Sequence, residues 1–341
     1  TGACGFIGSH MVEVLKEAGH KVVASDLPEA FEGKDELGKA RYPELVKKLA
    51  SQIFPADLTN KNSLKGIARG ADYIFHIAAI LDYSVSWEKL YNVNVVGTRN
   101  LFEVVAEENP DIKRVVVWST NGIYGFPEPG GIEVDENSAV KPVSKYALSK
   151  WFQERVAYEY FEKGIKVSVI KPTAVYGPRC VYGLLDMIKA INNLPVVFCP
   201  KNFTFRIPFV HVRDVCRSAL FVAQRKESEG EDYIVDDDSG ISYIDFMKYA
   251  AKEFVKPFIT LPSTPLQSFR RAFLMASRIE TILASIARRR PKLEYELLLF
   301  TGYDFKYSNK KLKSLGFELQ YPSILDGFSE SINWYKEAKL L

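Results

Sequence analysis

Three glycines spaced three residues apart, Gly2, Gly5 and Gly8, constrain this chain more than any other feature. Glycine permits a tight turn and lets backbone N–H groups approach a diphosphate, and a helix that begins there directs its N-terminal N–H groups at the anion. Apolar residues with helical spacing follow over residues 7–15, and Gly19 ends the predicted helix. The pattern predicts a dinucleotide-binding turn.

An acidic residue closes the strand that is predicted after this helix. Residues 21–26 read Lys-Val-Val-Ala-Ser-Asp. The strand ends at Asp26, about 20 residues after the glycines, where dinucleotide folds bind the adenosine ribose hydroxyls. The carboxylate would repel a 2′-phosphate, and residues 27–29 contain no Lys or Arg to attract one. Asp26 therefore favours NAD, although an acidic cap at a strand end is the alternative.

Dinucleotide folds place a hydrophobic strand directly before the glycine turn, at the centre of the sheet. This sequence begins at Thr1, without such a strand and without Met. An empty central position would leave hydrogen-bonding groups of the neighbouring strands unpaired. We therefore expect the first strand to be missing from the given sequence and the natural protein to have several more N-terminal residues.

Composition bounds the class of protein. With 341 residues, 47% hydrophobic and 26% charged, the chain can form a nucleotide-binding domain and a smaller lobe. A net charge of +3 is too small to indicate nucleic-acid binding. The cysteines and histidines lack metal-ligand spacing, so we expect no metal site, no disulfide framework and a reducing, cytoplasmic location. No apolar run reaches the length of about 18 residues that would predict a membrane-spanning helix.

The first half of the chain alternates strand and helix patterns. Strands are predicted at residues 53–56, 73–77, 114–118 and 166–170, and helices at residues 62–69, 87–107 and 144–162. This alternation predicts an α/β fold of the Rossmann type, a doubly wound parallel sheet with helices on both faces. We expect an NAD-binding domain over residues 1–178 and a smaller, mainly substrate-binding C-terminal lobe over residues 179–341. Residues 209–222 and 233–235 are expected to return to the main sheet.

Tyr146 and Lys150 lie four residues apart in a predicted helix, and hence on the same face. A free tyrosine has a pKa of about 10, and a nearby ammonium would favour the phenolate and lower that pKa. The preceding strand ends in residues 118–125, Trp-Ser-Thr-Asn-Gly-Ile-Tyr-Gly, which brings hydroxyl groups to the ligand-binding edge of the sheet. The pair is therefore a candidate acid/base, rather than a chance pair on a helix surface.

With these residues in place, the chain resembles the extended short-chain dehydrogenase/reductase family, also called the NAD-dependent epimerase/dehydratase family. The resemblance covers nearly all of the chain. The motifs occur in the family's order: TGACGFIG at residues 1–8, Asp57-Leu58, His76-Ile77-Ala78-Ala79, Asn94-Val95-Val96-Gly97-Thr98, STNGIYG at residues 119–125, Tyr146 with Lys150, Pro172 with Tyr176-Gly177-Pro178, and FVHVRDV at residues 209–215.

The resemblance implies a role for each matching residue. Tyr146 would be the acid/base, Lys150 would hold the nicotinamide ribose and tune the tyrosine, and Thr120 would hydrogen-bond the reacting oxygen. Ser119 is a credible substitute for Thr120. The residues implied to bind NAD are Gly2, Gly5, Phe6, Ile7, Gly8, Asp26, Asp57, Leu58, Ala78, Ala79, Tyr146, Lys150 and Pro172.

Other motif residues have architectural interpretations. For Asn94, a structural role that ties a helix to a neighbouring strand is as well supported as a functional one. His211 and Asp214 are interpreted as architectural. The resemblance also implies a homodimer that forms through the helices at residues 87–107 and 144–162.

The resemblance leaves the reaction open between branches of the family. Sugar-nucleotide dehydratases carry Asp-Glu after the catalytic threonine, where this chain has Asn121-Gly122, so dehydration is disfavoured. Sugar-nucleotide epimerases place an asparagine for the substrate diphosphate where this chain has Ala174. Arg206 matches the family's nucleotide-binding arginine, or forms a salt bridge at the surface. The tail over residues 304–317 resembles the 3β-hydroxysteroid dehydrogenase and sterol-4-carboxylate 3-dehydrogenase branch.

Residues 266–290 combine an apolar stripe with six arginines and a single acid, Glu280. The stripe consists of Leu266, Phe269, Phe273, Ala276, Ile279, Leu283 and Ile286. A basic amphipathic helix can lie on an anionic membrane surface. Alternatively, this helix covers the substrate lobe and keeps its charged face in water.

The leading hypothesis is an NAD-dependent oxidoreductase that transfers a hydride between a secondary alcohol or ketone and the nicotinamide. The substrate would be a bulky apolar molecule of sterol or isoprenoid type. Tyr83, Asn121 and Arg206 are candidate substrate contacts, and Trp87 and Phe126 are compatible with an apolar substrate. The alternative is a nucleotide-sugar 4-epimerase with tightly bound NAD. A non-catalytic NAD-binding scaffold is less favoured, because a pure binder needs no complete catalytic set.

Overall fold

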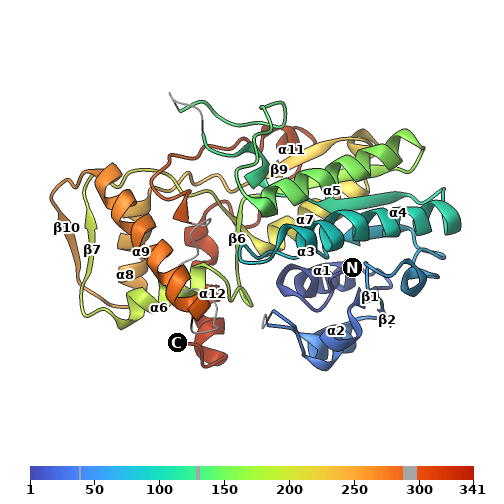
Figure 1. The fold of residues 1–341 in the computed structure, drawn as a ribbon, viewed down its shortest axis with the longest axis horizontal. Helices are drawn as coiled ribbons and strands as arrows, with labels where there is room; N and C mark the ends of the chain where they lie inside the picture. The colour runs from blue at the N-terminus through green and yellow to red at the C-terminus, as the bar shows by residue number, and fades with distance from the viewer. Residues whose placement is uncertain (38–39, 128–130, 287–297) are drawn as a thin grey trace.

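The computed structural model describes residues 1–37, 40–127, 131–286 and 298–341. Its main part is a parallel α/β sheet with helices on both faces (Figure 1), as the alternating strand and helix patterns predict. Four strands pair in the order β3-β4-β5-β9, and β1 pairs with β2 beside them. The strands are β1 (Val23–Asp26), β2 (Gln52–Pro55), β3 (Tyr73–His76), β4 (Arg114–Trp118), β5 (Val167–Pro172) and β9 (Asp232–Val235).

The first residues of the chain lie between β1 and β3. The Thr1 ammonium donates to the carbonyl of Phe75 in β3 at 2.9 Å. The N–H of Ala3 donates to the carbonyl of Ser25 in β1 at 3.1 Å. The glycine turn therefore begins between the ends of these two strands, and the strand expected before it stays a prediction.

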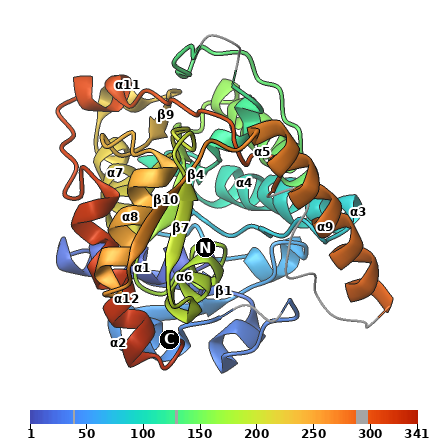
Figure 2. The same cartoon turned by 90° about the vertical axis from the view of Figure 1, so that its left-hand side faces the viewer.

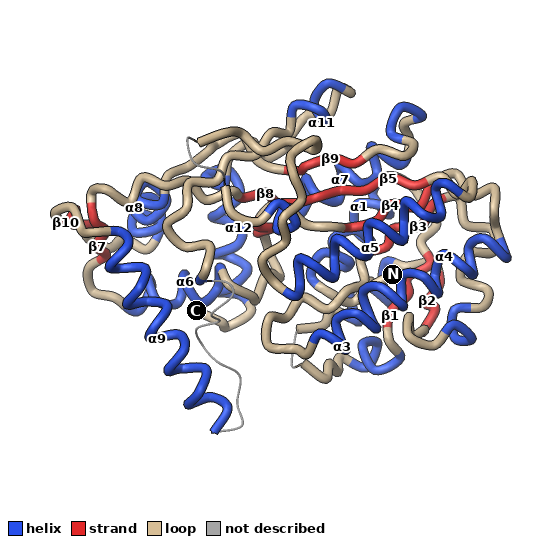
Figure 3. The backbone as a smooth tube through the Cα atoms, turned by 45° about the horizontal axis from the view of Figure 1, so that its top comes forward, coloured by secondary structure: helices blue, strands red, loops and turns tan. Residues whose placement is uncertain are grey.

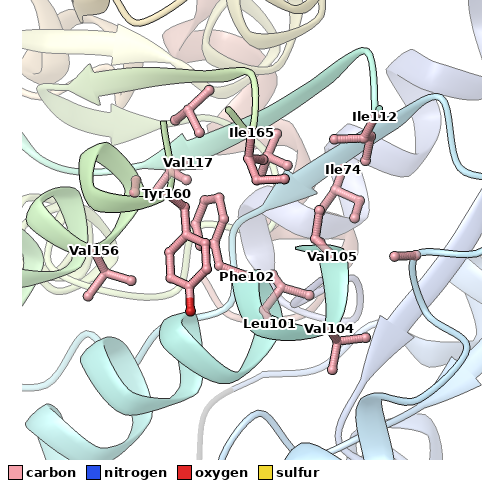
Figure 4. Packing of buried hydrophobic residues seen from close by; sticks show 14 of the residues in the cluster. Ile74, Leu101, Phe102, Val104, Val105, Ile112, Val117, Val156, Tyr160 and Ile165 are labelled. Atoms are coloured by element: carbon pink, nitrogen blue, oxygen red, sulfur yellow. The ribbon is translucent and has the colours of Figure 1, made fainter. Parts of the chain in front are cut away.

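Alternate side chains of β4 serve two cores, one on each face of the sheet. Val115 and Val117 pack against α4 and α5, whereas Val116 and Trp118 pack on the side of α1 and α7. Figure 4 shows the packing on the α4 and α5 side. This two-sided burial explains why the strand reads as an unbroken apolar run. The helices concerned are α1 (Phe6–Glu17), α4 (Gly97–Glu108), α5 (Lys145–Glu162) and α7 (Val212–Ala223).

One predicted helix is wrong, and a second is present with an irregular middle section. Residues 62–69 contain the 3-10 turn η2 (Lys61–Leu64) and then turns, because Gly66 has φ +95°, a conformation that interrupts a right-handed helix. The predicted helix over residues 87–107 is present as a continuous helical run with a π-helical middle section. Its segments are α3 (Trp87–Leu90), the π-helical η3 (Tyr91–Val96) and α4.

Asn94, in the π-helical section, ties three segments together. Its side chain accepts from the N–H of Ile80 at 2.8 Å and donates to the Ile80 carbonyl at 3.1 Å and to Ser149 Oγ at 2.9 Å. The residue is fully buried. Asn94 therefore fixes the loop after β3 against α5, the helix that carries Tyr146 and Lys150.

The remaining elements gather beside the sheet around a separate apolar core (Figures 1 and 3). A parallel pair, β7 with β10, and a second parallel pair, β6 with β8, belong to this part. No described helix is both long and apolar enough to cross a membrane. The elements are β6 (Ala174–Tyr176), α6 (Leu184–Asn193), β7 (Val197–Pro200), β8 (Phe209–His211), α8 (Tyr243–Glu253), β10 (Phe258–Leu261), α9 (Leu266–Ile286) and α12 (Ile324–Glu337). Of the other elements, α11 (Lys310–Ser314) packs against β9 of the main sheet. The short helices η1 (Pro28–Glu32), α2 (Pro43–Leu49), η4 (Asn121–Tyr124) and η5 (Lys226–Ser228) lie elsewhere.

His211, at the end of β8, and Asp214, in the first turn of α7, contact the loop before α12. Asp214 accepts from the backbone N–H groups of Gln320 at 2.8 Å and Tyr321 at 2.7 Å. The ring of His211 lies 3.7 Å from that of Tyr321, centroid to centroid. Both residues are fully buried. These contacts agree with the architectural interpretation of the two side chains.

Replacing Asn94 by Ala is expected to lower the free energy of unfolding by about 1–3 kcal/mol, because buried polar groups of Ile80 and Ser149 lose a partner. Urea denaturation measures this change. The exposed Asn62 provides the control, and Asn62→Ala should stay within about 0.5 kcal/mol of the parent. Equal stability of the Asn94→Ala variant and the parent would refute the architectural role.

Candidate active site

The glycine turn has the close backbone contacts that a diphosphate-binding turn requires. Gly2 has φ +71°, and an added Cβ would lie 2.8 Å from the Ala78 backbone. A Cβ on Gly8 would lie 1.9 Å from the carbonyl oxygen of Gly2. Glycine is therefore required at both positions. Because α1 begins at Phe6, its first N–H groups are available to an anion at the turn.

Asp26 is held at the end of β1 by two backbone groups. Its Oδ2 accepts from the N–H of Cys4 at 2.8 Å, and its Oδ1 accepts from the N–H of Leu27 at 2.9 Å. Each carboxylate oxygen can accept a further hydrogen bond. The oriented carboxylate and the tight glycine turn together fit an adenosine ribose and its diphosphate, so these residues would hold NAD.

A cavity of about 1700 Å³ brings the predicted site residues together. This volume exceeds that of a typical single-ligand pocket and leaves room for a cofactor and a substrate. Trp87 and Phe126, which the sequence analysis holds compatible with an apolar substrate, are not among the described residues that line the cavity. The lining includes all the predicted cofactor-binding and catalytic residues and the three candidate substrate contacts: Gly2, Gly5, Phe6, Ile7, Gly8, Asp26, Asp57, Leu58, Ala78, Ala79, Tyr83, Thr120, Asn121, Tyr146, Lys150, Pro172 and Arg206.

Tyr146 lies in the first turn of α5 with its ring edge against Tyr83, at 5.9 Å between centroids. Burial, and then the neighbouring Tyr83, raise the pKa of Tyr146 above its ordinary value. The sequence predicts the opposite, a pKa lowered by Lys150, and the structure differs because desolvation disfavours the phenolate. The phenol therefore holds its proton at neutral pH and is ready to donate it.

Lys150 lies one turn further along α5 and is almost completely buried. Its Nζ donates to Gln153 Oε1. Burial lowers the pKa of Lys150 to about 7, and the Glu154 carboxylate acts in the opposite direction. Because this pKa lies near neutral pH, nearby charges such as the Glu154 carboxylate influence whether Lys150 is protonated.

A buried charged group behind Lys150 escaped the sequence analysis. Lys171 Nζ lies 3.5 Å from Glu154 Oε2, donates to Tyr124 Oη at 3.2 Å and pairs with Asp232. Burial raises the pKa of Glu154, and Lys171 opposes that rise. Glu154 follows Lys150 by four residues, which places both on one face of α5. That spacing is the signal that could have identified Glu154 from the sequence.

The two candidate hydroxyls after β4 have different surroundings. Thr120 Oγ1 accepts from the N–H of Gly122 at 3.1 Å and caps the short helix η4, and the residue is partly exposed. Ser119 is buried, and its hydroxyl lowers the pKa of the Glu154 carboxyl. Thr120 is therefore the more accessible hydroxyl at the cavity.

Aromatic and apolar side chains line the part of the cavity away from the glycine turn. Among them, Tyr307 lies close enough to Asn121, the neighbour of Thr120, for the Asn121 side chain to oppose the rise that burial causes in the pKa of Tyr307, so the aromatic wall reaches the candidate catalytic hydroxyl. Phe126 stacks on another wall residue, Tyr303, at 4.7 Å between centroids. Sequence reasoning missed most of this wall, because its members are far apart in the chain: Phe203, Phe205, Tyr243, Phe273, Phe300, Tyr303, Phe305 and Tyr307.

Two of the proposed substrate-side residues have other partners. Trp87 packs against Tyr91 and Phe152. Arg206 lines the cavity, yet its Nε and Nη2 donate to the Asp304 carboxylate at 2.8 and 2.5 Å. The salt-bridge interpretation of Arg206 is therefore the one that the structure shows.

Comparison with known proteins gives the site its context. Residues 1–236 match the model of the NAD dependent epimerase/dehydratase family. Sterol-4-alpha-carboxylate 3-dehydrogenase, decarboxylating, of Mus musculus is 24% identical over 329 residues, which cover 92% of this chain and 84% of that protein. UDP-N-acetyl-alpha-D-glucosaminuronate decarboxylase of Bacillus cytotoxicus is 32% identical over 189 residues. That match covers 54% of this chain and spans 56% of the relative's length.

Solved structures share the fold. The crystal structure of a UDP-glucose 4-epimerase with UDP-glucose, from Thermotoga maritima, superposes with a TM-score of 0.72. The superposition covers 99% of this chain and 98% of that chain, at 19% sequence identity. At this identity the likeness establishes the Rossmann-type architecture.

Replacing Tyr146 by Phe is expected to lower kcat by about 10²–10⁴-fold, because the proton of the reacting oxygen loses its carrier. Steady-state kinetics on any turned-over alcohol or ketone measures this effect. The exposed Tyr91 supplies the matched control, since Tyr91 does not line the cavity and Tyr91→Phe should leave kcat within about twofold. A loss smaller than about tenfold for Tyr146→Phe would contradict the assigned role.

Proposed function

Because this chain belongs to the NAD-dependent epimerase/dehydratase family and is an extended short-chain dehydrogenase/reductase enzyme, we propose that it interconverts a bulky apolar secondary alcohol and its ketone. A substrate of sterol or isoprenoid type suits the cavity. NAD, the cofactor of the family, supplies the hydride acceptor or, when reduced, the hydride.

The apolar character of the substrate end carries this proposal. Its wall combines phenyl and phenol rings with aliphatic side chains, and both bind hydrocarbon surface through dispersion and desolvation. The guanidinium of Arg206 is already neutralised by Asp304. The likeness to the mouse sterol-4-alpha-carboxylate 3-dehydrogenase extends over most of both chains and supports the same substrate class.

The residues of this chain would divide the chemistry among themselves. Thr120 Oγ1 would hydrogen-bond the reacting oxygen and hold it beside Tyr146. During reduction, the Tyr146 hydroxyl gives its proton to that oxygen as the carbonyl carbon gains a hydride. Lys150 would bind the nicotinamide ribose, and its ammonium would stabilise the phenolate that remains. The raised pKa of Tyr146 keeps the phenol protonated at neutral pH, as proton donation during reduction requires. Alkaline pH favours oxidation, because oxidation of the alcohol releases a proton.

A nucleotide-sugar 4-epimerase with tightly bound NAD is the second candidate. It is supported by the position of Arg206 in the cavity lining, where a cation could meet a diphosphate if Asp304 released it. The two candidates differ in cofactor use. An epimerase returns its hydride to the substrate, whereas a dehydrogenase releases NADH in each turnover.

Absorbance at the NADH band tests the choice. With NAD at alkaline pH, a 3β-hydroxysterol should yield NADH in stoichiometric amount, and a UDP-hexose should yield none. Tyr146→Phe is the control for adventitious reduction. Conversion of the UDP-hexose to its C4 epimer without net NADH, and no reaction with sterols, would replace the dehydrogenase proposal by the epimerase.

The same proposal gives α9 a role at a membrane surface. Figures 2 and 3 show that α9 extends away from the rest of the fold. Its exposed side chains include Met275, Ile279, Ile282, Leu283 and Ile286, each more than half exposed. Phe273, on the same helix, lines the cavity. An apolar substrate held in a bilayer would thus meet the helix that borders the site. The six arginines predicted to assist lie partly outside the described residues, at positions 288–290.

Sedimentation with vesicles tests the membrane contact. The protein should bind vesicles of phosphatidylcholine with phosphatidylserine, and less at high salt. The double variant Ile279→Glu, Ile282→Glu should bind at least about tenfold more weakly, because two apolar side chains become charged. Leu325→Glu, on α12, is the matched exposed control. Equal binding of parent and double variant would refute the contact.

We also propose a division into two domains, a homodimer and a cytoplasmic location. The division at residue 178 assigns NAD to the first part of the chain and substrate to the second. The homodimer would use the helical surfaces at residues 87–107 and 144–162, and sedimentation equilibrium would measure it. A cytoplasmic location, with contact to the membrane surface, agrees with the proposed reaction.

A further inference from the structure

Within the described residues, the three arginines that line the cavity each form an ion pair with a carboxylate. The pairs are Arg41 with Asp35, Arg179 with Glu13, and Arg206 with Asp304. Arginine is the side chain best suited to bind a diphosphate, because its planar fork matches two phosphate oxygens. In this cavity the three guanidinium groups are paired with carboxylates of the same chain instead, so the wall suits a neutral ligand.

The Arg206–Asp304 pair is held at the arginine side by its backbone. Both the main-chain N–H and the Nε of Arg206 donate to Asp304 Oδ1, at 2.9 and 2.8 Å, and Nη2 donates to Oδ2 at 2.5 Å. Arg206 also forms a backbone bridge with Ser242. The Asp304 carboxylate is therefore paired with an arginine whose main chain is held in place by its own hydrogen bonds.

On the other side, the pair holds a run of chain, residues 300–307, that we call the aromatic segment. Asp304 lies between Tyr303 and Phe305, and both of these rings line the cavity. Beyond Asp304, the segment is fastened by backbone bonds to Val134, which donates to the Lys306 carbonyl at 2.8 Å.

The aromatic segment also reaches the catalytic end of the site. Phe305 stacks on Tyr307, with 6.0 Å between the centroids and 5° between the planes. Tyr307 lines the same cavity as Asn121 and Thr120, and burial raises the pKa of Tyr307 whereas the Asn121 side chain lowers it. The position of Asp304 thus determines the positions of the Tyr303, Phe305 and Tyr307 rings. A substrate would contact these rings next to the reacting groups.

We propose that the Arg206–Asp304 ion pair is the specificity determinant of this site: it presents the aromatic segment to an apolar substrate and withholds the arginine from a nucleoside diphosphate. The proposal rests on the proposed function for its first half. Its second half concerns binding alone and holds whatever the reaction is. Neutralising the carboxylate should weaken the first property and release the second.

Asp304→Asn tests both halves with nearly unchanged side-chain shape. UDP serves as the diphosphate probe, with isothermal titration calorimetry on the NAD-saturated protein. UDP should bind the variant about tenfold or more tightly than the parent, since a charge-assisted pair no longer competes for Arg206. The KM for a 3β-hydroxysterol should rise about tenfold, whereas kcat should stay within about twofold, because Asp304 itself does not line the cavity.

Two further variants make the test specific. Arg206→Gln should raise the KM for the sterol as Asp304→Asn does, yet it should gain no UDP affinity because the cation is gone. Glu17→Gln removes the carboxylate from a similar pair, in which Arg213 donates at 3.2 and 2.5 Å on the surface formed by α1 and α7. This control should leave UDP binding and the KM unchanged. Quenching of tryptophan fluorescence by NAD verifies that each variant is folded.

The outcomes separate the two proposals. Unchanged UDP affinity and unchanged sterol KM in Asp304→Asn would overturn the role of the ion pair, even if the parent oxidises sterols. UDP binding as tight to the parent as to the variant would also overturn it. Absence of sterol turnover by the parent would refute the proposed function, whereas a gain of UDP affinity in Asp304→Asn, but not in Arg206→Gln, would still support the withheld arginine.

Discussion

The close backbone contact among Gly2, Gly8 and Ala78 is the constraint on which the site depends. It lets α1 begin directly at the edge of the sheet, between the ends of β1 and β3. Because the strands are parallel, their carboxyl ends meet at that same edge. Asp26, Ala78 and Thr120 therefore line one cavity although they follow three different strands. A single Cβ at Gly8 would separate the helix from the turn.

Burial determines the chemistry of the polar groups at this edge. Desolvation raises the pKa of Tyr146, lowers that of Lys150 and raises that of Glu154, so each group is driven toward its neutral form. The groups remain usable because they have partners. Glu154 and Gln153 face Lys150, and Lys171 faces Glu154. The acid/base pair thus belongs to a larger buried network on α5 and the strands beneath it.

The substrate end follows a different principle, in which charges are paired with each other and rings face the space. The Arg206–Asp304 pair brings residues 205–207 and 300–307 together, and both contribute aromatic side chains to the wall. The ion pair is partly exposed, so its contribution to stability is small. Its proposed role is to position the aromatic segment against the substrate and to keep the Arg206 guanidinium paired.

Hydrophobic periodicity was enough to predict the parallel α/β fold, which the structure confirms. Local spacing was enough to single out the glycine turn, Asp26 and the Tyr146–Lys150 pair, which all line the cavity. The helix predicted over residues 62–69 was wrong, because Gly66 adopts a positive φ that interrupts a right-handed helix despite the apolar pattern. Only the tertiary structure decided the pKa of Tyr146, the network around Glu154, the partner of Arg206 and the aromatic wall. These depend on burial and on contacts between distant segments, such as Arg206 and Asp304, which are separated by 98 positions in the chain. Neither burial nor such contacts can be read from neighbouring residues in the sequence.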